Sequence, residues 1–306
     1  MILVYGQGDD PPIAHLVAAL HSAGARFQLL DIARLDQARL HIQVGPYGLA
    51  GELVVDGVCT ALADIRAVYA RPLDPAVADQ PTSDQPEPAQ KHALALHRQL
   101  VEWLDVAPAR VVSRPAAMQA NASKPLQAQW IGEAGFRVPP TLVTSDEAEV
   151  RAFQKTHGRV VFKSISGIRS IVTELDDSWL SRMHRLAQLP TQFQAYVPGV
   201  DVRVHVVGQQ ALAAEITSTA TDYRYAQRSG ATAQVAATTL PPAIAARCIA
   251  MSHAMGLPLS GIDLRLRPDG EYVCFEVNPM PAFSYFEAES GLPIAAALAG
   301  LLMGEG

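Results

Sequence analysis

The stretch that decides the fold is Gly261-Ile-Asp-Leu-Arg-Leu-Arg267, then Pro-Asp-Gly, then Glu271-Tyr-Val-Cys-Phe-Glu-Val-Asn278. Apolar and polar residues alternate in both halves, which predicts two strands because successive side chains of a strand point to opposite faces. Asp269-Gly270 favours a two-residue hairpin loop. Such a loop predicts that Asp263 pairs with Glu276 and Leu264 with Phe275, whereas a three-residue loop would place the two carboxylates on opposite faces.

The polar face of this hairpin has the residue types of a magnesium site. If the apolar residues share the core face, then Asp263, Glu276 and Asn278 share the other face. Two carboxylates and an amide oxygen suit Mg²⁺, a hard cation that takes oxygen ligands together with water and substrate phosphates. The alternative is a solvated strand face on which Arg265 neutralises Asp263 and Glu276. Alternation alone does not decide between them, and Pro279, which ends the strand at Asn278, favours the metal site.

Length and composition describe a globular chain. Of its 306 residues, 49% are hydrophobic and 18% charged, which is enough to fill a core. At roughly 100–200 residues per domain, this length indicates two domains or one subdivided domain. The formal net charge of −6 argues against a nucleic-acid binder, which needs a basic face to displace counterions from phosphates.

Cysteine usage and apolar runs point to an intracellular protein. Cys59, Cys248 and Cys274 lack the spacing of a disulfide framework or a zinc site, so each is expected to be a small buried hydrophobe. The N-terminus lacks the basic and apolar regions of a signal peptide. No window reaches the ~18 apolar residues of a membrane span. We therefore expect a cytoplasmic protein with no membrane partner.

The chain begins with the pattern of a small parallel sheet. Ile2–Tyr5 and Phe27–Leu30 are predicted strands on either side of a helix at Ile13–Ala23. A Pro- and Asp-rich loop, Pro72–Gln90, follows later, and its role stays open. The character of the sequence changes near Val111, so we divide the chain at about residue 112.

The hairpin, extended through Pro279, resembles the metal-binding end of the ATP-grasp superfamily. It is closest to the RimK-like carboxylate ligases and, within them, to the graspetide (microviridin-type) peptide ligases. Further matching segments stand in the family's order: Asn121-Ala-Ser-Lys124-Pro, Gly135-Phe-Arg-Val-Pro-Pro-Thr141, Val160-Val-Phe-Lys163, Gln194–Gly208, Ala214-Glu-Ile216 and Asp222-Tyr-Arg224. The likeness covers roughly Val111 to Glu287, with a weaker match at Tyr69-Ala-Arg-Pro72.

This resemblance implies the ATP-grasp fold, of class α/β + α+β. An N-terminal α/β domain would span residues 1–112. A central lobe would span residues 113–195, and a C-terminal lobe with the metal site would span residues 196–306. The two α+β lobes would clasp ATP between them.

The resemblance also implies contacts to the ATP phosphates. Lys124 and Lys163 would contact the phosphates as point charges; the alternative is two surface lysines. Lys163 ends an apolar strand just before a Ser/Gly loop. In that loop Ser164, Ser166 and Gly167 would cover the phosphates with backbone N–H groups, although many relatives have several glycines there and this loop has one.

The expected adenine site is a hinge between the lobes. Gln194, Ala195, Tyr196 and Val197 would bond adenine through their backbone, since Ala195 stands where relatives often carry an acidic residue. A plain edge strand is the alternative. Asp201, just beyond the hinge, would reach the ribose or serve as an ordinary turn residue.

Two arginines complete the implied catalytic set. Arg203 would stabilise charge on the transferring phosphoryl group, unless it pairs instead with Glu215 on the neighbouring strand. Arg224 matches a position tied to the acyl acceptor or the phosphate in the peptide-ligase branch. His205 lies on the same strand face as Arg203 and is expected to be structural, so no general base is assigned.

The implied reaction activates a carboxylate as an acylphosphate and joins it to an amine or hydroxyl on a peptide or amino acid. Its cofactors would be ATP and Mg²⁺, with two ions and with Mn²⁺ able to substitute, and homodimers are common in such enzymes. The alternatives are a phosphotransferase of the same fold and a nucleotide-binding scaffold without chemistry. After Pro279 the chain departs from the peptide-ligase pattern. There Phe283, Tyr285 and Phe286 either line the substrate site or pack the terminal helix.

Overall fold

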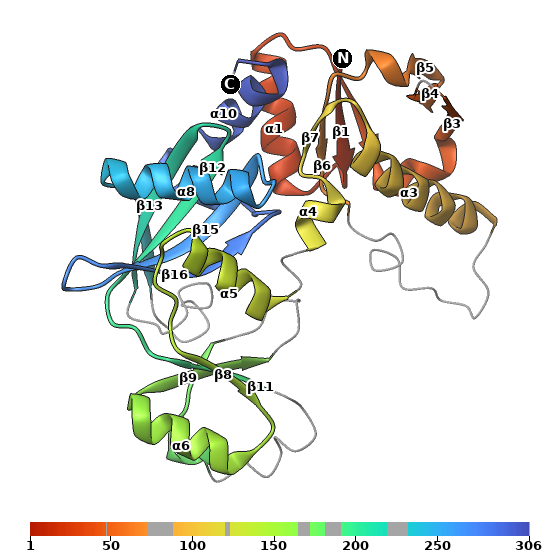
Figure 1. The fold of residues 1–306 in the computed structure, drawn as a ribbon. Coiled ribbons are helices and arrows are strands. Elements are labelled where there is room, and N and C mark those ends of the chain that lie inside the picture. The colour runs from red at the N-terminus through yellow and green to blue at the C-terminus, as the bar shows by residue number, and fades with distance from the viewer. Residues whose placement is uncertain are drawn as a thin grey trace.

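The computed structural model describes residues 1–46, 48–72, 88–119, 123–164, 172–180, 191–218 and 232–305, with the backbone alone for Ser164, Asp177 and Leu180. Within these residues the strands form four sheets with helices packed on their faces (Figure 1). Most of the Pro72–Gln90 loop, residues 73–87, lies outside the described residues.

A parallel sheet covered on both faces begins the chain. Its elements are β1 (Ile2–Gly6), α1 (Pro11–Ser22), β2 (Phe27–Asp31), the 3-10 helix η1 (Ile32–Gln37), β6 (Ala67–Ala70), α3 (Pro88–Val106), β7 (Arg110–Val112) and, from the far end of the chain, α10 (Ile294–Met303). The strand order is β2-β1-β6-β7. Helices α1 and α10 cover one face, and η1 and α3 cover the other. Every residue of β1 is therefore buried, which explains its continuous apolar run.

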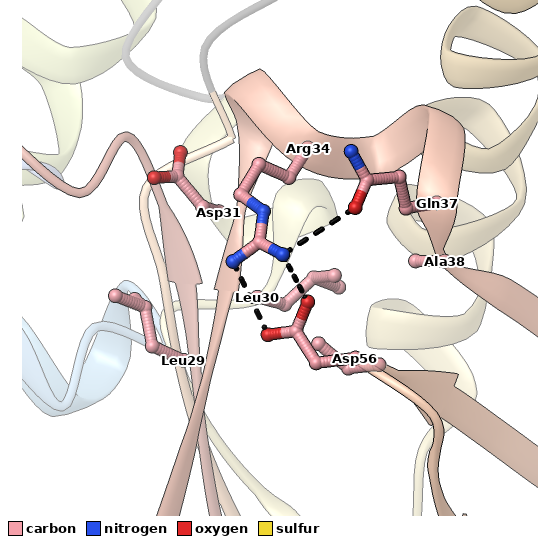
Figure 2. A pocket seen from close by; sticks show the side chains of 8 residues that line it. Leu29, Leu30, Asp31, Arg34, Gln37, Ala38 and Asp56 are labelled. Atoms are coloured by element: carbon pink, nitrogen blue, oxygen red, sulfur yellow. Dashed lines mark hydrogen bonds and ion pairs between the residues drawn. The ribbon is translucent and has the colours of Figure 1, made fainter.

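A small antiparallel sheet is inserted between β2 and β6. It consists of β3 (Arg39–Gly45), β4 (Gly48–Val55) and β5 (Val58–Ala61), followed by the 3-10 turn η2 (Leu62–Asp64). The loop between β4 and β5 is Asp56-Gly57, with φ of 50° and 76°. Positive φ at both central residues is typical of a two-residue type I′ loop. Figure 2 shows Arg34 reaching from η1 to the Asp56 carboxylate at the side of a pocket. Arg34 Nη2 donates to Asp56 Oδ1 at 2.5 Å, and the pocket has a volume of about 150 Å³.

The central lobe is an antiparallel sheet with one long helix against it. Its elements are β8 (Thr141–Thr144), α6 (Glu147–His157), β9 (Val160–Ser164), β10 (Thr173–Glu174), α7 (Asp177–Leu180) and β11 (Thr191–Ala195), and α4 (Pro115–Gln119) and α5 (Lys124–Glu133) precede it. The strand order is β10-β9-β11-β8. Val150 of α6 packs with Val160 and Phe193 in a separate small core.

A five-stranded antiparallel sheet forms the C-terminal lobe. Its elements are β12 (Val200–Val207), β13 (Gln210–Ser218), β14 (Ala233–Thr238), α8 (Pro242–Ala254), β15 (Leu259–Leu266), β16 (Tyr272–Asn278) and α9 (Ser284–Ser290). The order is β14-β13-β12-β15-β16. The expected pairing of β12 with β13 and of β15 with β16 is confirmed. Helix α8 covers one face of this sheet, and α9 and α10 pack on the other.

The β15–β16 loop differs from the expected two-residue turn. Arg267 N donates to Glu271 O at 2.9 Å and Gly270 N donates to Arg267 O at 2.9 Å, so the loop is Pro268-Asp269-Gly270. The reason is Pro268. A two-residue loop would need Pro268 to donate an N–H to Glu271, and proline has none. Gly270 instead takes a left-handed φ of 86°, which fits a three-residue loop.

A β-bulge restores the pairing that this longer loop would have broken. Leu264 pairs with Cys274, not with Phe275 as expected, and the register then shifts so that Asp263 still pairs with Glu276. The extra residue is Phe275, and a bulge places two residues of one strand opposite one of the other. Cys274 consequently packs in the core beside Leu264, so the expectation that Phe275 lies on the core face is wrong.

The cysteines follow their strands. Cys248 and Cys274 are buried as expected, whereas Cys59 is exposed because the small sheet leaves one face of β5 uncovered. Cys59 Sγ lies 3.1 Å from Glu52 Oε2.

The two ends of the described chain pack together. Helix α10 lies beside α1 (Figure 1), and both contribute to one apolar cluster with β1, β6 and β13. The division at residues 1–112, 113–195 and 196–306 stays a prediction, and the first of these segments is completed by a helix from the last. Among the described helices, none combines the length and apolarity that a membrane crossing requires.

Candidate active site

The paired carboxylates Asp263 and Glu276 lie on one face of the C-terminal sheet, and α5 is fastened beside them. The Gln127 side-chain amide donates to Val277 O at 2.7 Å and accepts from Val277 N at 3.1 Å. Lys124 lies one helical turn before Gln127, on the same side of α5. Docking α5 on β16 therefore brings Lys124 to Glu276.

Two of the expected phosphate ligands contact one of the expected metal ligands. The Lys124 ammonium donates to Glu276 Oε1, and Lys163 Nζ lies 4.0 Å from Glu276 Oε2. Burial by itself would raise the pKa of Glu276, but the charges of Lys124, Lys163 and Arg203 outweigh it and hold that pKa below its usual value. Glu276 is therefore a carboxylate at neutral pH, as a metal ligand must be.

Arg203 is aimed at the second carboxylate. Its Nη1 donates to Asp263 Oδ1 at 2.6 Å, and its side chain is only 7% exposed. The alternative partner, Glu215, is wrong, because Arg203 pairs with Ala214 and Asp263 across the sheet while Glu215 pairs with Val202. Lys124, Lys163 and Arg203 thus place three positive charges against two negative ones.

A glycine makes room for this arginine. A Cβ at Gly261 would lie 2.1 Å from Arg203 Nη2 and 2.8 Å from the Pro281 side chain. The Arg203 guanidinium also lies 5.4 Å from the centre of the Phe286 ring, within the range of a cation–π contact. Gly261, Pro281 and Phe286 together form a close-fitting seat, so the direction of Arg203 is set by packing.

Asn278, the third expected ligand, is oriented by a local turn. Its Oδ1 accepts the Met280 N–H at 2.9 Å, and an amide oxygen retains a second lone pair. Within the part of the chain that the structure describes, no three His, Cys, Asp or Glu side chains cluster as metal ligands. Two carboxylates and one amide oxygen fit Mg²⁺, which needs few protein ligands, and do not resemble a nitrogen or sulfur site.

The hinge is ordered by bonds of its own. Ala195 N donates to Pro140 O at 3.0 Å and Tyr196 N donates to Arg159 O at 2.9 Å. Gln194 Nε2 donates to Thr141 Oγ1 at 3.0 Å. The N–H groups of Ala195 and Tyr196 are therefore engaged within the protein, and the expected backbone contacts from residues 194–197 to adenine stay a prediction.

Arg265 connects the hinge to Asp201. It donates to Asp201 Oδ1 at 2.8 Å and to Val197 O at 2.8 Å. The alternative in which Arg265 neutralises Asp263 and Glu276 is therefore wrong. Because Asp201 is tied to Arg265, a contact from Asp201 to a ribose would have to share this carboxylate.

Several expected site residues lie outside this description. Ser166, Gly167 and Arg224 fall outside the described residues, and Ser164 is described as the last backbone position of β9. Their roles stay predictions.

The aromatic segment after the metal face mostly packs the core. Phe283 and Phe286 are buried with α1 and α10, whereas Tyr285 is 46% exposed. His205 is fully buried, with its ring 5.2 Å from Phe286. Burial, and secondarily the charge of Arg203, lower the pKa of His205 well below its usual value. A neutral, enclosed imidazole agrees with the structural role expected for it.

A family model for the RimK-like ATP-grasp domain matches residues 123–302, more than half of the chain. The chain belongs to the RimK-like ATP-grasp family. The expected family and fold are thereby confirmed, and the expected class of ATP-grasp ligase is confirmed at the level of this family.

A shorter stretch of the chain is similar to a protein of another name. A glutathione synthetase of Neisseria meningitidis serogroup A is 35% identical over 79 residues, and the match covers 22% of this chain and 25% of that protein. The chain thus spans only about a quarter of that relative's length.

Solved structures match over nearly the whole chain. The ATP-grasp ligase PsnB, in complex with a phosphomimetic variant of a minimal precursor, Mg and ADP, is 26% identical with a TM-score of 0.79, covering 99% of this chain and 98% of that one. The macrocyclase MdnC of Microcystis aeruginosa MRC, bound with precursor peptide MdnA, has a TM-score of 0.81 at 20% identity, covering 99% and 100%, and shows the shared fold.

Sequence reasoning missed three residues that shape this RimK-like site. Gln127 docks α5, Gly261 admits Arg203, and Arg71 donates to Pro281 O at 3.1 Å. Gln127 carried a signal, since it stands three residues after Lys124 and so shares its helix face. The other two act through contacts between distant segments, which spacing does not show.

Proposed function

We propose that this protein is an ATP- and Mg²⁺-dependent ligase that joins a carboxylate to an amine or hydroxyl on a peptide or amino-acid substrate. One observation carries the proposal: Lys124, Lys163 and Arg203 converge on Asp263 and Glu276. When Mg-ATP binds, the phosphate oxygens would pair with the three cationic side chains, and Mg²⁺ would bind the two carboxylates. The same side chains thus serve as each other's partners and as the binding groups for Mg-ATP.

The reaction we propose has two steps. The substrate carboxylate attacks the γ-phosphorus of ATP, and the bond from this phosphorus to the β-γ bridging oxygen breaks. ADP is the leaving group, and the substrate becomes an acylphosphate. The amine or hydroxyl then attacks the acyl carbon, loses its proton, and displaces inorganic phosphate. Bound Mg²⁺ would neutralise phosphate charge. Arg203, fixed in its seat by Gly261 and Phe286, would stabilise charge that develops on the transferring phosphoryl group.

The peptide substrate is supported by the relatives. PsnB and MdnC are each solved with a precursor peptide, and both match nearly the whole of this chain. The acceptor end of our site differs in sequence after Pro279, where Tyr285 is the exposed aromatic residue. We propose a peptide substrate on these grounds and place its acceptor group near this segment.

The finer expectations are proposals as well. We propose two Mg²⁺ ions, with Mn²⁺ able to substitute, Arg224 at the acceptor or phosphate, and the Ser164–Gly167 loop over the phosphates. The cytoplasmic location and the homodimer likewise stay predictions, which cell fractionation and light scattering would test.

An ADP-release screen against peptides and amino acids tests the proposed activity. The wild-type protein should release ADP and inorganic phosphate together with a product whose mass equals that of the joined molecule or molecules less one water. Lys163→Ala should remove this activity, and the exposed Lys155→Ala of α6 is the matched control. ADP without inorganic phosphate would identify a phosphotransferase, and nucleotide binding without turnover against every acceptor would identify a scaffold.

A further inference from the structure

A buried arginine of the N-terminal sheet reaches the metal face. Arg71 follows β6 and is 6% exposed, and its backbone N–H donates to Tyr5 O at 2.8 Å. Its side chain donates from Nη1 to Pro281 O at 3.1 Å and to Met280 O at 3.4 Å. One guanidinium group therefore holds two consecutive carbonyls of a segment more than 200 residues away in sequence.

Asp10 fixes the other side of this guanidinium. Arg71 Nε donates to Asp10 Oδ2 at 2.5 Å, and the Asp10 side chain is 17% exposed. Asp10 precedes α1 yet makes no side-chain bond to the helix it begins, so its carboxylate is committed to Arg71. A shielded ion pair holds its geometry when further hydrogen bonds satisfy its members, and the two carbonyls supply them here.

The segment that Arg71 holds ends at the metal face. Met280 N donates to Asn278 Oδ1 at 2.9 Å, so Met280 contacts Asn278 through its N–H and Arg71 through its carbonyl. The same guanidinium also holds Pro281. The Pro281 side chain packs close to Gly261, the residue that makes room for Arg203. Displacement of this segment would therefore move the Asn278 amide oxygen and loosen the Arg203 seat.

We infer that Arg71, anchored by Asp10, is a positioning residue that fixes Asn278 for metal binding from the N-terminal domain. The inference rests on the proposed function, because it takes Asn278 as a ligand of Mg²⁺. Partners that orient metal ligands in this way typically change metal affinity by about 10- to 100-fold when removed. Lysine has a single ammonium group and cannot reproduce the planar fork, so it should restore the position of the segment only in part.

Arg110 provides a matched control. It stands on β7 of the same sheet, and its side chain donates to Leu301 O of α10. Arg110 thus also joins the N-terminal sheet to a carbonyl of the C-terminal lobe, but its side-chain hydrogen bond goes to α10 and not to residues 278–281. Loss of a domain contact in general should affect Arg110→Met and Arg71→Met alike, whereas loss of ligand positioning should affect only Arg71→Met.

The experiment is titration of Mn²⁺ into the ADP-bound protein, followed by electron paramagnetic resonance, with Mg²⁺ calorimetry in parallel. We expect Arg71→Met to weaken the ion affinity about tenfold, Arg71→Lys to lie between it and wild type, and Arg110→Met to match wild type. Unchanged affinity in Arg71→Met, or equal weakening in Arg110→Met, overturns the inference. If Arg71→Met does not fold, Asp10→Asn decides, and wild-type affinity in that variant also overturns it.

Kinetics supply a second readout. The concentration of Mg²⁺ for half-maximal ADP release should rise in Arg71→Met, while the rate at saturating Mg²⁺ recovers toward wild type. Ion binding to the ADP complex needs no acceptor peptide. The inference can therefore fail while the ligase assay succeeds, and the ligase assay can fail while ion binding still depends on Arg71.

Discussion

Two hairpins of this protein contain the same Asp-Gly pair and turn differently. In β4–β5, Asp56-Gly57 is the whole loop, between the paired residues Val55 and Val58. In β15–β16, Asp269-Gly270 is preceded by Pro268, and the loop has three residues. The first strand pair stays regular throughout, whereas the second carries a bulge at Phe275.

The difference shows how the β-bulge keeps the correct side chains of β16 on the face that forms the candidate site. In the first hairpin a register change would exchange exposed side chains, because β5 is largely uncovered. In the second hairpin the core needs Cys274 opposite Leu264, and the site needs Glu276 opposite Asp263. With a three-residue loop only an extra residue satisfies both, because the side-chain period of a strand is two.

The largest effect is expected from the carboxylate that this register presents. Glu276→Gln should lower ADP release by about 100-fold or more, since it removes a charged group that faces the phosphoryl site. Glu52→Gln, the same change on the first hairpin, should leave the rate at wild type. The measurement is steady-state ADP release, and equal rates in both variants would contradict a metal face on β16.

Thiol labelling compares the two hairpins directly. Burial raises the pKa of the Cys274 thiol well above its usual value, so Cys274 should react roughly 100-fold more slowly than the exposed Cys59 of β5. Native wild type should show one fast thiol with a chromogenic disulfide reagent, and Cys59→Ser should show none. A second fast thiol at Cys274 would mean that the hairpin has the two-residue register.

Gly261→Ala should affect turnover more than stability. The added Cβ would meet Arg203 Nη2 at 2.1 Å, and displacement of a group by about 1 Å can cost about 100-fold in rate. Gly57→Ala is the control: φ is 76° there and nothing lies within 4 Å, so it should cost about 1–2 kcal/mol of unfolding free energy with no loss of rate. Thermal denaturation and ADP release together separate the two outcomes.

Deletion of Pro268 should convert the second loop into a copy of the first. Arg267 and Glu271 flank the loop in either form, so β15 and β16 should keep their register and the bulge. We expect ADP release within about threefold of wild type and a stability change of about 1 kcal/mol or less. Loss of activity would show that the length of the loop, and not only the pairing of Arg267 with Glu271, sets the register of β15 with β16.

The smallest effect is expected at the ion pair beside the first hairpin. The side chains of Arg34 and Asp56 are 54% and 49% exposed, and exposed pairs contribute about 0–1 kcal/mol. Arg34→Met should therefore lower the unfolding free energy by less than about 1 kcal/mol and leave ADP release unchanged. A larger loss, measured by urea denaturation, would indicate that this hairpin is as constrained as the second.

Much of the fold follows from local pattern. The apolar run of β1 and the alternation of β15 and β16 each predict a strand, because burial on both faces gives a continuous apolar run and burial on one face gives a period of two. The Asp-Gly signal does not give a two-residue loop between β15 and β16, because Pro268 lacks the N–H that such a loop requires. The bulge at Phe275 depends on what fits opposite Leu264, which alternation does not contain.

The charged residues of the candidate site can be predicted from the sequence, but the contacts that position them cannot. The resemblance predicts roles for Lys124, Lys163 and Arg203, and the structure brings them to Asp263 and Glu276. The sequence does not predict the partners of Arg265, because they depend on the antiparallel pairing of β12 with β15, which places Asp201 directly opposite Arg265. Contacts of this kind depend on tertiary packing.

The pairing of α10 with α1 bears on how the chain is made. Leu16 and Leu20 of α1 share an apolar cluster with Leu298 and Leu302 of α10, so the first helix keeps an uncovered apolar stripe until the last helix has left the ribosome. A nascent chain in this condition exposes surface that invites aggregation. The apolar cluster between α1 and the parallel sheet therefore cannot be completed until α10 has been synthesised, more than 180 residues after the strands that it covers.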